Sequence, residues 1–445
     1  MTTSNFYYKS STFLLVFLLL LLLSGCSATK NLNQNLSKQI NQTGNFSTGF
    51  TGFVLYDPTT KKTIFKHNSD KYFTPASNIK LLTFYAGLQT LEDSIPSMRY
   101  AIKNDSLIFK ATGDPSLLNP DLPDSGLLEF LKSRNEQLFY LKPSYTEKAF
   151  GPGWAWDDYN YAFSAERAAF PIYGNKLKVI FKENNPLPRT KPSVFENLIT
   201  PEENSLKNYT GIHRKLNSNH FTYIPKENEE NFEANVPFIY SEELFLKLLS
   251  DTLQREIHPI KVLPQKWQLS SSYYGIATDT LYKKMLQESD NLIAEQILLL
   301  ASESIADTLK SDIAIEFIKK KLLKSLPDEP IWVDGSGLSR YNLITPRTIV
   351  KLLEKIQNEV EWKRLSALLP AGGESGTLKS NYKAEYPFIF AKSGSMSNNY
   401  SLSGYLKTDN GNILIFSFMN SNFTVSNQLL KKKIEQILLF IKDNY

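Results

Sequence analysis

Residues 75–83 read Pro-Ala-Ser-Asn-Ile-Lys-Leu-Leu-Thr and contain the pattern Ser-x-x-Lys, formed by Ser77 and Lys80. Two short alternating runs precede it, at residues 53–57 and 63–66, and the turn between them predicts a β-hairpin. From residue 78 to residue 91, apolar residues recur at helical spacing. Ser77 is therefore predicted to lie at a strand-to-helix junction, with Lys80 three residues later on the same helix face.

Three further short pieces complete a pattern with this one. They are Ser289-Asp290-Asn291, the run Asp-Gly-Ser-Gly-Leu-Ser at residues 334–339, and Lys392-Ser393-Gly394. A lone Ser-x-x-Lys is common by chance. Alone, Ser-Asp-Asn is typical of a helix N-cap, and the run at residues 334–339 and Lys-Ser-Gly are each typical of a turn. Ser-x-x-Lys, Ser-x-Asn and Lys-Ser-Gly in this order are not expected by chance.

Length, composition and charge set limits on the class of protein. The chain has 445 residues, which is too long for a single ordinary core. Its apolar content of 42% and aromatic content of 13% favour packed domains over disorder. A net charge of +5 is small for this length and does not indicate a nucleic-acid-binding surface. The four histidines stand in no zinc or triad motif, so neither a metal nor another cofactor is predicted.

The N-terminus is typical of an export signal. The unbroken apolar run Phe13–Leu23 has 11 residues, whereas a membrane-spanning helix needs about 20. Leu-Ser-Gly-Cys follows at residues 23–26 and resembles a bacterial lipobox, so residues 1–25 are predicted to be a signal peptide and Cys26 the lipidated residue. An ordinary cleaved signal with an incidental cysteine is the alternative. Residues 26–48 are polar and predict a flexible tether.

The remaining pattern predicts an α+β fold with an interruption. Strand patterns occur near both chain ends, and helical patterns lie between them from about residue 280 to residue 358. Residues 49–95 and 265–445 are expected to form one domain, an antiparallel sheet with helices packed on it. Residues 96–264 contain many Pro, Asn and aromatic residues and short strand patterns, and are expected to form one or two inserted, mostly β domains.

The motifs Ser-x-x-Lys and Ser-x-Asn suggest nucleophilic catalysis. A serine hydroxyl needs a nearby base, and a partly buried lysine has a lowered pKa and can accept the proton, so Ser77 is assigned as nucleophile and Lys80 as base. The hydroxyl of Ser289 can relay a proton to a leaving amine, and the amide of Asn291 can hold a peptide backbone.

The third motif suggests recognition of a carboxylate. Lys392-Ser393-Gly394 is predicted to end a strand. Lys392 supplies charge, Ser393 supplies a hydroxyl, and Gly394 lets the substrate lie close to the strand. The backbone N–H of Ser395 can pair with that of Ser77 to form an oxyanion hole.

Taken together, the chain resembles the D-alanyl-D-alanine carboxypeptidase/endopeptidases, the class C low-molecular-mass penicillin-binding proteins. The resemblance runs from about residue 50 to the end and is most specific at residues 334–340. It implies a serine β-lactamase/transpeptidase-like domain with inserted domains after the nucleophile helix. It also implies acylation of Ser77 by peptidoglycan stem peptides, with trapping of the same serine by β-lactams.

The resemblance implies further substrate contacts. Relatives build a pocket for diaminopimelate from an aspartate of the Trp-rich insert motif and a methionine after the third motif. Asp158 and Met396 occupy similar places, and Arg340 is assigned to substrate binding as the end of the motif at 334–340.

The sequence therefore predicts a serine DD-peptidase that is exported, faces the periplasm and is held to a membrane through Cys26. The residue after that cysteine, Ser27, favours the outer membrane. Two alternatives remain open at this point: a β-lactamase or esterase of the same superfamily, and a non-catalytic peptidoglycan-binding protein.

Overall fold

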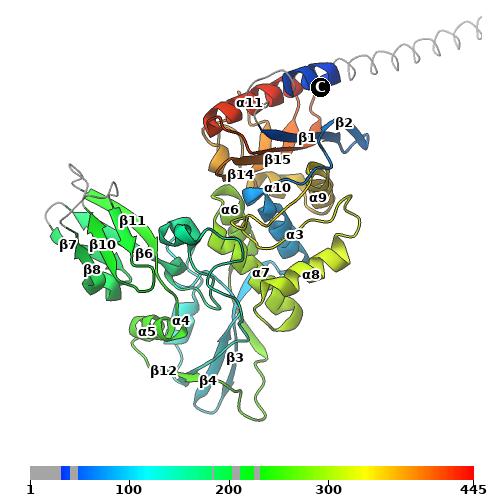
Figure 1. The fold of residues 1–445 in the computed structure, drawn as a ribbon. Helices are drawn as coiled ribbons and strands as arrows, with labels where there is room; N and C mark the ends of the chain where they lie inside the picture. Colours follow the sequence, from blue (N-terminus) through cyan, green and yellow to red (C-terminus); the bar gives the residue numbers. More distant parts are fainter. Residues whose placement is uncertain (1–31, 41–48, 183–184, 203–210, 225–230) are drawn as a thin grey trace, which may run out of the picture. The chain divides into compact units, whose positions relative to one another are not determined.

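The computed structural model describes residues 32–40, 49–182, 185–202, 211–224 and 231–445 (Figure 1). The chain forms two compact units. The first comprises the described residues up to Phe73 together with Ile344–Trp362 and Pro370–Tyr445, and the second comprises Thr74–Leu343 and Lys363–Leu369. The predicted signal peptide and Cys26 lie outside the described residues. Within the described residues, no helix is both long and apolar enough to cross a membrane.

The first unit is built on a five-stranded antiparallel sheet from both ends of the chain. The strand order is β14-β15-β16-β1-β2, so the first strand of the chain pairs with the last. Asp57 accepts from the N–H groups of Thr59 and Thr60 and so closes the predicted hairpin. The strands are β1 (Phe50–Asp57), β2 (Lys62–His67), β14 (Ile389–Met396), β15 (Asn399–Lys407) and β16 (Ile413–Ser421).

Helices cover both faces of this sheet (Figure 1). Helix α9 (Pro346–Glu359) contacts β1, β15 and β16, and its Leu353 carbonyl accepts from the hydroxyl of Tyr405 at 2.8 Å. Helix α11 (Asn427–Asn444) buries Ile434, Leu438 and other apolar residues. They form one hydrophobic cluster with apolar side chains of the sheet.

Residues 32–40 correct one prediction. They form a helix, and its Leu32, Leu36 and Ile40 are at most 3% exposed within the same cluster as α11. These three apolar residues recur every four positions, so they lie on one helix face. The predicted flexible tether at residues 26–48 is therefore wrong for residues 32–40, and its other residues lie outside the described range.

In the second unit, helices surround one that is almost wholly buried. The residues of α7 (Asn291–Ala306) from Leu292 to Glu303 are all buried. Helices α3, α6 and α8 contact it. These neighbours are α3 (Lys80–Thr90), α6 (Thr278–Gln287) and α8 (Ser311–Leu322), and α10 (Trp362–Leu368) reaches α6 through the ion pair of Arg364 with Asp279.

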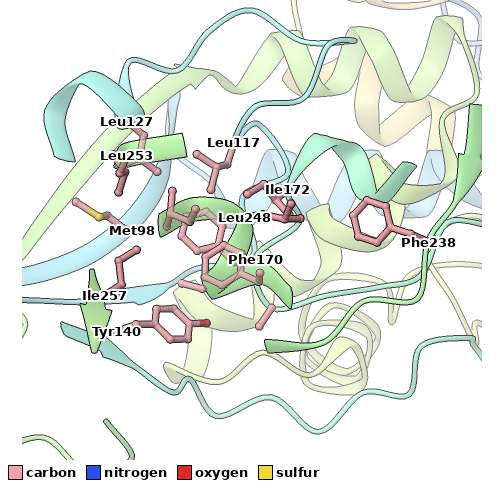
Figure 2. Close-up of a cluster of buried hydrophobic side chains, with 14 of the residues drawn as sticks. Met98, Leu117, Leu127, Tyr140, Phe170, Ile172, Phe238, Leu248, Leu253 and Ile257 are labelled. Carbon is pink, nitrogen blue, oxygen red and sulfur yellow. The ribbon is translucent and has the colours of Figure 1, made fainter. Parts of the chain in front are cut away.

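The rest of this unit consists mainly of three sheets. A five-stranded sheet has the order β12-β5-β4-β3-β13, and two three-stranded sheets have the orders β11-β6-β7 and β8-β10-β9. Helices α4 (Leu127–Lys132) and α5 (Glu242–Leu253) help to bury a shared core, which includes Tyr140, Phe170 and Phe238 (Figure 2). The strands are β3 (Ser94–Lys103), β4 (Ser106–Ala111), β5 (Gln137–Leu141), β6 (Lys176–Lys182), β7 (Asn185–Lys191), β8 (Ile199–Pro201), β9 (Gly211–Arg214), β10 (Phe221–Ile224), β11 (Asn231–Pro237), β12 (Ile257–Ile260) and β13 (Ser271–Ala277).

The α+β class predicted from the sequence is confirmed, whereas the predicted domain limits stay a prediction. The two compact units have other limits than the predicted domains, because α7 packs with the inserted strands as well as with α3. Leu299 of α7 and Leu309 belong to the core of the inserted strands. The strand excursion also extends beyond residue 264, since β13 pairs with β3.

Truncation of the side chain at position 36 tests whether residues 32–40 are part of the fold. Leu36 is fully buried, so Leu36→Ala should lower the free energy of unfolding by about 2–3 kcal/mol. Thermal unfolding of the chain from residue 27, followed by circular dichroism, measures the change.

Lys38→Ala is the matched control, because Lys38 lies on the same helix and is exposed. It should unfold at nearly the temperature of the unmodified chain. Equal unfolding temperatures for Leu36→Ala and Lys38→Ala would restore the tether interpretation.

Candidate active site

Ser77 and Lys80 lie where a tight turn becomes a helix. Residues Ala76–Ile79 form a 3₁₀ turn that leads directly into α3 at Lys80. Ala76 adopts φ 46°, a left-handed conformation that L-residues rarely take. The turn leaves Ser77 half-buried and brings its Oγ within 3.0 Å of Lys80 Nζ. The predicted i,i+3 juxtaposition is therefore present.

The ammonium group of Lys80 has three hydrogen-bond acceptors. Besides Ser77 Oγ, it donates to Asn291 Oδ1 at 2.6 Å and to the Ser336 carbonyl at 2.5 Å. Lys80 is fully buried. Three donated bonds correspond to the protonated form. Once the amine is neutral, it has a lone pair, and the Ser77 hydroxyl can donate to it instead.

Burial lowers the pKa of Lys80 to about 8, well below that of a solvated lysine. The charges of Asp334, Asp290 and Glu295 oppose this effect and keep the pKa from falling further. A base with a pKa near 8 is partly neutral close to physiological pH, which suits removal of a serine proton.

The carboxylate of Asp334 organises the loop that presents the Ser336 carbonyl. Asp334 is fully buried and accepts from Gly337 N at 2.9 Å, Ser339 N at 2.7 Å and Asn342 Nδ2 at 2.7 Å. Trp154 Nε1 donates to the same carboxylate at 2.8 Å. These donors replace the water that the buried charge has lost, and they fix the loop at residues 334–342.

Glu295 binds the backbone of the same residue, Ser336, through its N–H group. The N–H of Ser336 donates to Glu295 Oε1 at 2.8 Å, while the carbonyl of Ser336 accepts from Lys80. Burial, with the nearby Asp334 charge, raises the pKa of Glu295 to about 7. Arg167, also buried, lies 3.6 Å from Glu295 and 3.2 Å from Glu147. Glu295 is therefore a positioning residue for Lys80.

Gly337 is required where this loop meets the nucleophile turn. Its φ is 86°, and a Cβ at this position would lie 2.1 Å from the Ala76 carbonyl oxygen. Only glycine allows both the backbone conformation and this close approach. The loop thus supports the turn that holds Ser77.

Lys392-Ser393-Gly394 lies in the first compact unit, on the edge strand β14. Lys392 is fully buried, and its Nζ donates to the Ser393 carbonyl at 2.6 Å. The hydroxyl of Ser393 lies 2.7 Å from that of Thr377. Lys392-Ser393-Gly394 lies within β14, which continues to Met396, so the prediction that the motif ends a strand is wrong by two residues.

The remaining predicted residues fall in both units. In β14, Ser395 Oγ accepts from Asn427 Nδ2 at 3.2 Å, and Met396 pairs with Asn399. In the second unit, Ser289 has φ 61° two residues before Asn291. The roles predicted for these three residues in oxyanion binding, substrate contact and proton relay stay predictions.

Asp158 and Arg340 are brought together in the second unit. Burial and the neighbouring Asp157 raise the pKa of Asp158, and the charge of Arg340 acts in the opposite direction. The N–H of Arg340 donates to the Gly153 carbonyl at 3.2 Å, so the two predicted substrate residues lie on adjoining segments.

Ser336, Glu295 and Thr377 have contacts that the sequence analysis did not assign. A signal existed for Glu295, which is a lone carboxylate one helical turn after Asn291 in an otherwise apolar stretch. Among the described residues, no group of His, Cys, Asp and Glu side chains is arranged to hold a metal ion.

A family model described as the D-Ala-D-Ala carboxypeptidase 3 (S13) family matches residues 32–217 and 271–444. The chain belongs to this family. It is 24% identical over 435 residues to a D-alanyl-D-alanine carboxypeptidase DacB of Haemophilus influenzae, covering 88% of this chain and 90% of that protein. The predicted activity class, a serine-type D-Ala-D-Ala peptidase, is therefore confirmed.

Solved structures show the same fold. The crystal structure of penicillin binding protein 4 (dacB) from H. influenzae superposes with a TM-score of 0.70 at 20% identity, covering 92% of this chain and 98% of that one. The same protein complexed with a β-lactam has a TM-score of 0.65 at 19% identity, with the same coverage. The predicted penicillin-binding-protein architecture is confirmed.

The pH dependence of Ser77 acylation should follow Lys80. The neutral amine is the active base, so the rate should rise with pH through about 8 and level off above it. Glu295→Gln keeps an acceptor for the Ser336 N–H but removes a negative charge that raises the pKa of Lys80. The midpoint should then move to lower pH. Stopped-flow acylation by a fluorescent penicillin measures both profiles.

The matched control is Glu316→Gln on α8, an exposed glutamate that pairs with Lys320. Its midpoint should equal that of the unmodified protein. An unchanged or raised midpoint in folded Glu295→Gln would contradict the positioning role.

Proposed function

We propose that this protein is a lipid-anchored serine DD-peptidase of the periplasm that both removes terminal D-Ala from peptidoglycan stem peptides and cuts D-Ala–diaminopimelate cross-links. The observation that best supports the chemistry is the buried Lys80 ammonium, in contact with both Ser77 Oγ and Asn291 Oδ1. Family membership supports the substrate class.

The reaction proceeds through an acyl-enzyme. Neutral Lys80 takes the proton of Ser77 as Oγ attacks the carbonyl carbon of the scissile peptide bond. The tetrahedral oxyanion collapses, the C–N bond breaks, and the leaving amine takes a proton that originates from Lys80, for which Ser289 is the assigned relay. Water then attacks the ester, Lys80 accepts its proton, and the shortened stem peptide leaves as Ser77 regains its hydrogen.

Lys392 and Ser393 are assigned to the substrate carboxylate. The buried ammonium of Lys392 provides a fixed positive charge, and the paired hydroxyls of Ser393 and Thr377 provide hydrogen bonds. Beyond Ala391, whose N–H donates to the Pro370 carbonyl, β14 is at the edge of its sheet, so a peptide can align beside this part as a further strand.

Digestion of purified muropeptides tests this function. The chain from residue 27 should convert pentapeptides to tetrapeptides and split cross-linked dimers into monomers, as resolved by chromatography with mass spectrometry. Ser77→Ala should release neither product, because the nucleophile is lost. Thr59→Ala, in a turn of the other unit, serves as a control and should retain both activities. Product formation by Ser77→Ala would contradict the proposal.

Anchoring at Cys26 would keep the first unit near the membrane. Five residues separate Cys26 from the packed Leu32, and the six steps from Cα to Cα span at most about 20 Å. The segment between Cys26 and Leu32 is therefore shorter than the tether of residues 26–48 that was predicted from the sequence.

Metabolic labelling tests the anchor. Cells expressing the full chain with an alkyne-palmitate should yield a labelled protein that partitions into the detergent phase. Cys26→Ala should lose the label, because Cys26 is the only cysteine. Ser77→Ala should keep the label, and persistence of label in Cys26→Ala would contradict lipidation at this residue.

A further inference from the structure

One face of helix α11 presents two lysines and a leucine to solvent. Leu429, Lys432 and Lys433 occupy positions i, i+3 and i+4, which share one side of a helix. Leu429 is 44% exposed, Lys432 is exposed and Lys433 is half-buried. These three residues are called the basic face. None of them has a role in the chemistry described above.

The basic face is turned away from the apolar side of α11. That side packs into the hydrophobic cluster of the sheet through Leu430, Ile434, Ile437, Leu438 and Ile441. Lys431 provides a contrast, because its Nζ lies 5.3 Å from the centre of the Tyr400 ring and so packs onto the sheet. Glu435 is also engaged by the fold, since it accepts from the N–H of Lys383 at 3.2 Å.

The positive charge of the basic face is not offset in the way that the charge at the other end of α11 is. Lys442 pairs with Asp409 at 2.7 Å and with Asp443 at 3.0 Å. Lys433 instead donates to an uncharged amide, Gln436 Oε1, at 3.4 Å. The basic face therefore keeps its charge for a partner.

The helix at residues 32–40 connects this face with the N-terminus. It belongs to the same hydrophobic cluster as α11 and is drawn in dark blue beside it (Figure 1). Its Lys38 is exposed, and the helix contains no carboxylate. Because five residues separate Cys26 from Leu32, Cys26 lies at most about 20 Å from the cluster that α11 helps to form.

We propose that the basic face docks the first unit on the anionic lipid headgroups of the membrane that holds Cys26. Lysine side chains are attracted by anionic lipids over about 10 Å at moderate salt. A partly exposed leucine such as Leu429 can enter the boundary between headgroups and acyl chains. The inference rests on the proposed function, because the lipid at Cys26 is what keeps these headgroups near α11.

Sedimentation with lipid vesicles tests the docking. The chain from residue 27 lacks the anchor and so isolates the contact made by the folded protein. At low salt it should bind vesicles of equal parts phosphatidylglycerol and phosphatidylcholine at least about tenfold more tightly than vesicles of phosphatidylcholine alone. High salt should abolish this preference, because it screens exposed charges.

Two double variants test whether the charge of the basic face is responsible. Lys432→Gln with Lys433→Gln should reduce the preference to less than about threefold. Lys432→Arg with Lys433→Arg keeps both charges and should retain it. Both variants should be acylated by a fluorescent penicillin at the rate of the unmodified chain, which shows that they are folded.

The matched control is Lys320→Gln with Lys321→Gln, which removes two adjacent exposed lysines from α8 in the second unit. It should keep the full preference. Equal binding of the unmodified chain to both kinds of vesicle, or an equal loss in the two glutamine variants, would overturn the docking. Absence of lipid label from the unmodified full chain would instead overturn the anchor. The vesicle measurement does not involve Cys26, so the two failures are distinguishable.

Discussion

The rest of the catalytic arrangement depends on one buried positive charge. Removing an ammonium group from water costs several kcal/mol, and Lys80 has no exposed surface. Three acceptors and three nearby carboxylates offset part of this cost, so the amine is still protonated near neutral pH, with its pKa lowered to about 8. Ser77 is thereby paired with a base whose pKa suits its task.

This requirement explains why the supporting residues come from distant parts of the chain. The Ser336 carbonyl can face Lys80 only because Asp334 folds the loop and Glu295 holds the Ser336 N–H. Gly337 then allows the loop to lie against the turn before Ser77. A change at any of these positions would act on catalysis through Lys80, without contact to the reacting atoms.

Local rules predicted much of this site. The spacing of Ser77 and Lys80 on a helix predicted their contact, and the Ser-Asp-Asn motif was compatible with both a cap and a functional loop. The cap interpretation is confirmed, since Asp290 caps α7, and Asn291 on the first turn reaches Lys80. The roles of the motif in proton relay and substrate binding stay predictions. Residues 32–40 were misinterpreted because their many Asn and Gln side chains hide an apolar residue at every fourth position. The contacts of Ser336 with Lys80 and Glu295 could not be predicted, because they depend on tertiary packing of residues that lie 256 and 41 positions apart in the sequence.

Mass spectrometry with peptide mapping after incubation with benzylpenicillin tests whether Lys80 activates Ser77 as the nucleophile. We expect one penicilloyl adduct, located on Ser77 and absent from Ser77→Ala. Lys80→Met, which removes the base but retains much of the side-chain volume, should form the adduct at least about a hundredfold more slowly. An adduct on another residue, or undiminished acylation in Lys80→Met, would contradict the assignment of Lys80 as the base for Ser77.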